Sequence, residues 1–171
     1  MYRHSHRMVV LALSDYFGLK IGLGTVSRLR NQGSEAVSMA VEKAKVYVQS
    51  QKIVGADDTG FKQGNSDGKN PEEKKAWLWV AVTPLVSLFQ VMLARSTEAA
   101  QSLLGEKFSG ILNSDRYNAY NWLLISQRQL CWAHLKREFT KISERKGVSR
   151  QLGRDLLAQQ LRLFRLWSKV R

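Results

Sequence analysis

The change in hydrophobic spacing at Lys52 is the feature that most constrains the fold of this chain. Before Lys52, apolar residues recur every three or four positions, which predicts amphipathic helices over residues 3–17 and from Thr25 to about Gln51. After it, short apolar runs bounded by turn residues indicate strands. We expect strands at 53–56, 77–82, 85–93, 111–114 and 129–132, and helices over 97–108 and from 135 to the end apart from a break at Gly147. Strands and helices thus alternate in the second part of the chain, which is typical of an α/β protein.

The first 52 residues form the predicted helical segment. Gly22 and Gly24 mark a turn, and Thr25 is a suitable N-cap for the helix after it. The pair Met8–Phe17 and Thr25–Asn31 has the form of a helix-turn-helix, with Arg28 and Arg30 on its second helix. An ordinary helical hairpin fits the same pattern.

The charge of the chain is strongly positive and uneven. There are 27 Lys and Arg residues against 14 Asp and Glu, a formal net charge of +13. Residues 1–52 hold 8 basic and 3 acidic side chains, residues 53–135 hold 8 of each, and residues 136–171 hold 11 and 3. Two basic arms flank a neutral middle, which favours a polyanionic partner, nucleic acid above all. A merely solvated basic surface is the alternative.

Cysteine usage and hydropathy indicate the compartment. Cys131 is the single cysteine, so the chain has neither an internal disulfide nor a paired-cysteine zinc motif. The apolar runs at 8–13 and 76–88 are too short for a signal peptide or a membrane span. We therefore expect a cytoplasmic protein.

Two predicted strands end in an aspartate, Asp57 after residues 53–56 and Asp115 after residues 111–114. Carboxylates at the ends of neighbouring strands converge where a hard divalent cation, usually magnesium, could sit. Such an ion can activate a water or hydroxyl for phosphodiester chemistry. Alternatively, both aspartates are turn formers, a role that their side chains suit.

Four blocks of this sequence resemble the catalytic domain of bacterial insertion-sequence transposases of the sixty-six family, which are DDE transposases. The blocks follow the family order over roughly residues 10–145. They are Asp57–Phe61, Ala76–Pro84, Ser114–Trp122 and Gln129–Leu135. The resemblance implies a ribonuclease-H-like core, an α/β fold with a mixed sheet and flanking helices, which is partial here and covers residues 53–145. Residues 146–171 are then a basic helix that starts a helical insertion.

The resemblance also implies a set of site residues. Asp57 and Asp115 match the first two acids of a triad that binds two Mg²⁺ (or Mn²⁺) ions, and Asp58 stands where the family commonly has Glu. Cys131 and His134 match a CxxH signature whose histidine is thought to lie near the scissile phosphate, although a buried cysteine and a hydrogen-bonded core histidine would give the same sequence. Further candidates for phosphate or DNA contact are Arg116, Lys136 and Arg137.

The third acid of the triad is a glutamate that the family places beyond a helical insertion, and this chain stops inside that insertion. Glu138 follows His134 by four residues and lies on the same helical face, so it could reach the metals. We predict that Glu138 is instead a surface residue of its helix, because the family motif places no catalytic acid there.

The expected function is that of a DNA transposase, with DNA binding, metal-dependent cleavage and strand transfer at transposon ends and target DNA, in an incomplete and inactive fragment. One alternative is a non-catalytic DNA-binding regulator that pairs with a full-length transposase or forms homo-oligomers. The other alternative is a ribonuclease-H-like nuclease that uses Glu138.

Overall fold

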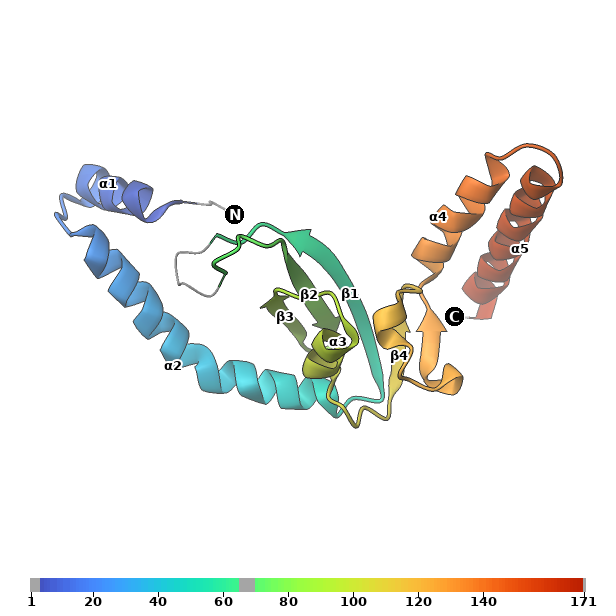
Figure 1. The fold of residues 1–171 in the computed structure, drawn as a ribbon, viewed down its shortest axis with the longest axis horizontal. Coiled ribbons are helices and arrows are strands. Elements are labelled where there is room, and N and C mark those ends of the chain that lie inside the picture. Colours follow the sequence, from blue (N-terminus) through green and yellow to red (C-terminus); the bar gives the residue numbers. More distant parts are fainter. Residues whose placement is uncertain (1–3, 65–69, 171) are drawn as a thin grey trace. The chain divides into compact units, whose positions relative to one another are not determined.

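The computed structural model describes residues 4–64 and 70–170 (Figure 1). Arg3, Arg171 and residues 65–69 lie outside the described residues. The chain divides into two compact units, residues 1–46 and residues 47–171. Each unit is described by itself.

The first unit consists of α1 (His6–Phe17) and most of α2 (Leu23–Gln49). Helix α1 begins after Ser5, whose hydroxyl accepts the backbone N–H of Met8 at 3.2 Å. It ends at Gly18, whose φ of +64° is the left-handed conformation that glycine tolerates best.

The helix predicted from Thr25 to about Gln51 is α2, but it begins at Leu23, so Thr25 is not its N-cap. Thr25 and Gly24 lie inside α2, which continues without a break for 27 residues. A single glycine inside a helix, such as Gly33, costs only about 1 kcal/mol and does not end it. The last turn of α2 belongs to the second unit, where Val48 is fully buried in the core.

The second unit is built on a five-stranded mixed sheet in the order β3-β2-β1-β4-β5. Strands β1, β2 and β3 are antiparallel neighbours, while β1, β4 and β5 run parallel. The strands are β1 (Ile53–Phe61), β2 (Ala76–Val82), β3 (Ser87–Met92), β4 (Ile111–Ser114) and β5 (Arg128–Leu130). This sheet and its flanking helices confirm the predicted α/β fold with a ribonuclease-H-like arrangement.

Strand β1 is longer than the sequence suggested. The apolar run ends at Ala56, but the strand continues to Phe61 because β2 pairs with it from Gly55 onwards. Its parallel pairing with β4 ends at Gly55 and Asn113. Asp57 therefore lies within a strand rather than in a turn after it.

Helices cover the sheet and extend beyond it. Helix α3 (Thr97–Leu104) starts after Ser96, whose hydroxyl accepts the backbone N–H of Ala99, and stops before the predicted end at Phe108 because Gly105 takes a φ of +87°. Short 3-10 turns lie at Asn118–Tyr120 and Ile125–Gln127. The other helices are α4 (Trp132–Ser143) and α5 (Val148–Val170). The last strand was predicted to end at Trp132. Trp132 instead begins α4.

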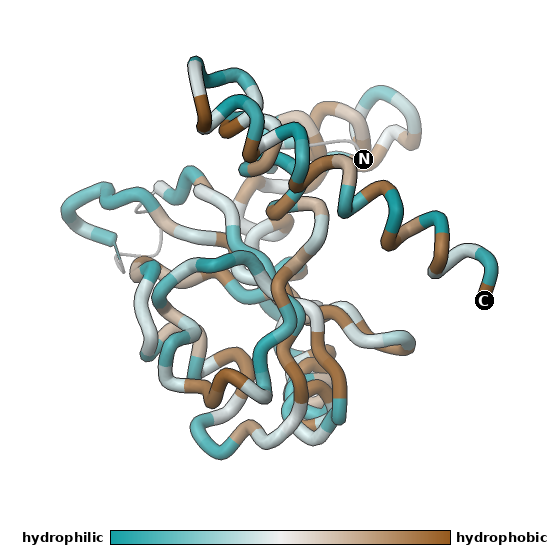
Figure 2. The backbone as a smooth tube through the Cα atoms, turned by 90° about the vertical axis from the view of Figure 1, so that its right-hand side faces the viewer, coloured by the Kyte–Doolittle hydropathy of each residue, from teal (hydrophilic) through white to brown (hydrophobic). Residues whose placement is uncertain are grey.

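The hydrophobic core lies between one face of the sheet and α3. Val54, Trp79 and Leu112 from three neighbouring strands are fully buried there, together with Leu103 of α3 and Tyr120. Helices α4 and α5 run side by side (Figure 1), with the Trp132 and Phe164 rings edge to face at a centroid distance of 5.6 Å. Along α5, hydrophobic and hydrophilic residues alternate to its end (Figure 2).

Candidate metal centre

Three side chains from separate segments converge at the end of β4. Asp57 comes from the middle of β1, Asp115 directly follows β4, and His134 lies in the first turn of α4. One possible ligand atom from each lies within 4.8 Å of the other two. They border a cavity of about 260 Å³, whose other lining residues are Gly55, Ala56, Val80, Val82, Asn113 and Cys131.

Backbone donors orient both carboxylates. Oδ1 of Asp57 accepts the backbone N–H of Asp58 at 2.9 Å, and Oδ1 of Asp115 accepts that of Tyr117, also at 2.9 Å. In addition, the Arg128 guanidinium donates to the backbone carbonyl of Asp115 at 3.3 Å. These bonds hold the acids in place and leave further lone pairs on both carboxylates for a ligand.

His134 contributes an unsatisfied buried nitrogen. Its Nδ1 is buried and has no hydrogen-bond partner among the described residues. A buried polar atom left in this state costs about 1–3 kcal/mol, and a bound ion would remove that cost. Two carboxylates and an imidazole form a donor set that suits divalent cations such as Mn²⁺. The residues present therefore fit a divalent metal ion.

Asp58 lies on the opposite face of β1, because side chains alternate along a strand. Its side chain is only 2% exposed, and Oδ1 accepts Nε–H of Arg95 at 2.6 Å. Burial raises the pKa of Asp58 despite the opposing effect of Arg95. Asp58 therefore serves as a buried partner of Arg95, and Asp57 is the acid that the fold brings to Asp115.

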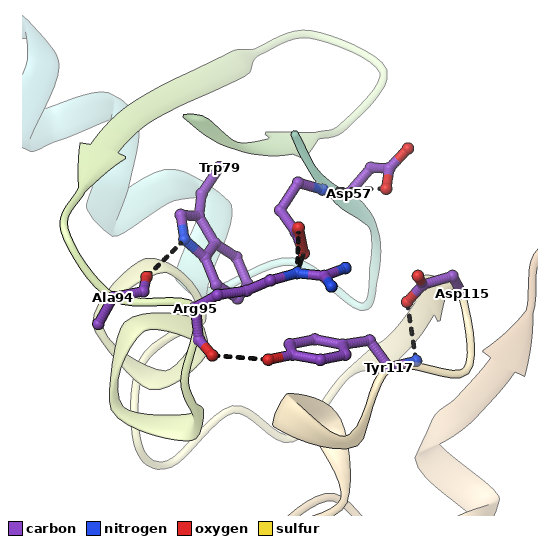
Figure 3. Close-up of polar contacts among 7 residues, drawn as sticks. Asp57, Trp79, Ala94, Arg95, Asp115 and Tyr117 are labelled. Carbon is purple, nitrogen blue, oxygen red and sulfur yellow. Dashed lines mark hydrogen bonds and ion pairs between the residues drawn. The ribbon is translucent and has the colours of Figure 1, made fainter. Parts of the chain in front are cut away.

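Sequence reasoning missed Arg95 and Tyr117, which complete this polar cluster (Figure 3). The guanidinium carbon of Arg95 lies 3.7 Å from the centroid of the Tyr117 ring, and the Tyr117 hydroxyl donates to the Arg95 backbone carbonyl at 2.6 Å. Arg95 is 37 residues from Asp58. Neither periodicity nor spacing in the sequence indicates that they meet.

Glu138 lies outside the group of three possible ligands. Its carboxylate accepts Lys141 Nζ at 2.9 Å and lies 3.5 Å from Arg116 Nη2. The Lys141 hydrogen bond lowers the pKa of Glu138, with smaller contributions from the neighbouring arginines. Within residues 4–64 and 70–170, Asp57, Asp115 and His134 are the only such group of three or more.

The remaining basic candidates lie in different places. Arg116 is exposed and lies close to Glu138 in the fold, and Arg137 is exposed and directly precedes Glu138 in the sequence. Lys136 instead lines an apolar groove between α4 and α5. Cys131 is half-buried, borders the metal-centre cavity and precedes α4. The fold thus brings His134 to the aspartates and turns Lys136 toward α5.

The family model described as "Transposase IS66 family" matches residues 6–171. The chain belongs to this family. No curated protein and no solved structure matches it. Membership in a DDE transposase family implies a DNA substrate and the use of divalent metal, and the convergence of Asp57, Asp115 and His134 is consistent with the latter. No helix in the described part of this IS66 transposase chain is long and apolar enough to cross a membrane.

Helix α5 of the IS66 transposase chain carries a basic face. Five of its cations are exposed, and at 3.6 residues per turn they fall within about one third of the helix circumference. They are Arg150, Arg154, Arg162, Arg165 and Lys169. Such a row of cations on one face matches the charge of a phosphate backbone.

Proposed function

We propose that this chain carries the metal-holding part of the catalytic centre of an IS66 transposase, with Asp57, Asp115 and His134 as ligands of a divalent ion. The observation that supports this most strongly is the convergence of three ligand atoms within 4.8 Å from β1, the segment after β4, and α4. The buried Nδ1 of His134 has no hydrogen-bond partner among the described residues, which is compatible with a bound ion. The substrate is DNA, at transposon ends and at the target.

The chemistry proposed is phosphoryl transfer on a DNA phosphodiester. A bound divalent ion supplies a Lewis acid that activates a water or 3′-hydroxyl and stabilises the charge on the phosphate. Asp57 and Asp115 hold that ion through oxygens oriented by the backbone donors of Asp58 and Tyr117. In this proposal Arg116, which is exposed and directly follows Asp115, contacts the phosphate of the bound strand.

We further propose that this chain by itself does not carry out strand transfer. Two ions on either side of a scissile phosphate ordinarily require a further carboxylate. The described residues bring no third acid to Asp57 and Asp115, and Glu138 is engaged by Lys141 and Arg116.

A second candidate function is that of a non-catalytic DNA-binding chain that pairs with a complete transposase. The basic face of α5 favours it, because electrostatic binding to a duplex needs cations and no catalytic acid. The two proposals predict the same DNA binding but differ in metal binding.

Calorimetric titration with Mn²⁺ and Mg²⁺ tests the metal site. We expect Asp57→Asn to weaken Mn²⁺ binding by at least the roughly 10- to 100-fold that loss of an outer-shell partner costs. His134→Ala should weaken Mn²⁺ binding more than Mg²⁺ binding, because imidazole nitrogen suits Mn²⁺ better than the oxygen-seeking Mg²⁺. Asp155→Asn, an exposed acid on α5, is the matched control.

The titration distinguishes the two roles for His134. If His134→Ala leaves both ion affinities unchanged and weakens DNA binding, the histidine contacts phosphate rather than metal. Equal binding by wild type and Asp57→Asn would exclude the site altogether.

Cleavage of supercoiled plasmid in the presence of Mn²⁺ tests the incomplete acid set. We expect no nicking above background by wild type, Asp115→Asn or Glu138→Gln. Nicking by wild type that both substitutions abolish would identify Glu138 as the third acid and the chain as a nuclease.

A further inference from the structure

The sheet alone does not set the distance between Asp57 and Asp115. The parallel ladder of β1 and β4 ends at the pair Gly55 and Asn113, and each aspartate lies two residues beyond that pair. Past this point β1 is paired only with β2, on its other side. Some other contact must therefore hold the two acids at a spacing that suits one ion.

A continuous chain of contacts joins the two acids on the opposite side of β1. Asp58, next to Asp57, accepts Nε–H of Arg95 through Oδ1 at 2.6 Å and Oδ2 at 3.1 Å. The Arg95 guanidinium lies over the Tyr117 ring, and the Tyr117 hydroxyl donates to the Arg95 carbonyl. The backbone N–H of Tyr117 then donates to Oδ1 of Asp115. Figure 3 shows this sequence of contacts from one aspartate to the other.

The surroundings of Arg95 restrict its movement. The guanidinium carbon also lies 4.8 Å from the centroid of the Trp77 ring. The backbone beside it is held by Trp79, whose indole N–H donates to the carbonyl of Ala94 at 3.3 Å. Trp79 is fully buried and pairs with Asp58 across β1 and β2. Arg95 therefore sits in a fixed place between the two segments that carry the acids.

We propose that Arg95 is a positioning residue that sets the spacing of Asp57 and Asp115 through Asp58 and Tyr117. It touches neither metal ligand directly. Only an arginine suits this place, because its planar guanidinium can bond a carboxylate and lie flat on an aromatic ring at once. A lysine keeps the charge but offers a single ammonium with no flat face.

This inference rests on the proposed metal site, and its test measures Mn²⁺ binding without DNA, by calorimetry and by the electron paramagnetic resonance spectrum of the bound ion. Arg95→Lys keeps the charge, so electrostatic attraction of the ion is unchanged. We expect a measurable loss of Mn²⁺ affinity, below the roughly 10- to 100-fold cost of losing a group bonded directly to a metal ligand, and a broadened spectrum of the bound ion.

Two further variants complete the test. Tyr117→Phe keeps the ring under Arg95 and removes only the hydroxyl bond to its carbonyl, so we expect a smaller loss of affinity than for Arg95→Lys. Lys75→Met is the control, because Lys75 stacks on the same Trp77 ring at 4.6 Å without touching Asp58 or Tyr117. It should bind Mn²⁺ as wild type does. Near-ultraviolet circular dichroism of the tryptophans reports whether each variant is folded.

The outcomes separate this inference from the proposed function. If wild type binds no Mn²⁺, or Asp57→Asn binds as well as wild type, the metal site itself is wrong and this inference falls with it. If wild type binds Mn²⁺ and folded Arg95→Lys binds it equally, only the positioning role of Arg95 is overturned. If Arg95→Lys does not fold, Tyr117→Phe decides, and unchanged affinity in that variant overturns the inference.

Discussion

Neutralising two arginines of α5 should weaken DNA binding and reduce the salt dependence of the DNA-binding constant. Arg162 and Arg165 lie on the basic face of α5, are exposed, and have no ion pair among the described residues. The variant Arg162→Gln/Arg165→Gln removes two positive charges and keeps most of each side chain's length. Neither residue belongs to the metal centre, so metal binding should not change.

The size of the effect follows from counterion release. Each duplex phosphate neutralised by a cation contributes a slope of about −0.9 to the dependence of log K on log salt. If both arginines contact phosphates, the slope loses about 1.8 in magnitude, which corresponds to about 60-fold weaker binding at 0.1 M salt. A surface that DNA does not touch would lose only the weak long-range attraction, which salt screens within about 10 Å.

Fluorescence anisotropy with a random-sequence duplex, titrated at several salt concentrations, measures both quantities. The matched control is Lys74→Gln/Lys107→Gln, which removes the same charge from exposed positions in the neutral middle of the chain. An unchanged slope for the α5 variant, or an equal drop in the control, would show that α5 does not lie on the DNA.

Three other predictions concern stability. A Cβ at Gly153 would lie 2.2 Å from the backbone nitrogen of Ser143, so Gly153→Ala should force α4 and α5 apart and lower the free energy of unfolding by about 1–2 kcal/mol in urea denaturation. Gly33→Ala, which meets nothing within 4 Å, should instead gain about 0.5–1 kcal/mol. Because burial raises the pKa of Asp58 above 3.8, the metal-free protein should lose stability as pH rises from 3.8 through the raised value. Asp58→Asn should lack this loss. Urea midpoints of both proteins, measured across the acidic range with a chelator present, test this. A wild-type midpoint that rises with pH over this range would contradict the prediction.

The raised pKa of Asp58 also bears on why the pair with Arg95 exists. Burial raises the pKa of the Asp58 carboxyl although Arg95 opposes this, so the pair is weak evidence for stability. A buried ion pair of this kind can instead specify position, since a carboxylate and a guanidinium meet in few geometries. In this chain the position specified is that of the segments bearing Asp57 and Asp115.

Local sequence determined most of the elements of the second unit. Apolar runs marked the strands that became β2, β3 and β4, and Gly147 marked a helix break as predicted. These features depend on neighbours in the chain, on side-chain alternation and on capping, so a single sequence carries them. The candidate metal ligands Asp57 and Asp115 were recognisable for the same reason, because each directly follows an apolar run.

The tertiary structure decided what depends on distant partners. Strand β1 runs through Asp57, Asp58 and Gly60, residues that favour turns, because the whole length of β2 satisfies their backbone groups. His134 reaches the aspartates because the parallel pairing of β4 with β5 places the start of α4 beside Asp115. Arg95 meets Asp58 across 37 residues of chain. Sequence by itself specifies local conformation and charge, whereas pairing between remote strands sets which side chains meet, because hydrogen bonds and burial act through space and not along the chain.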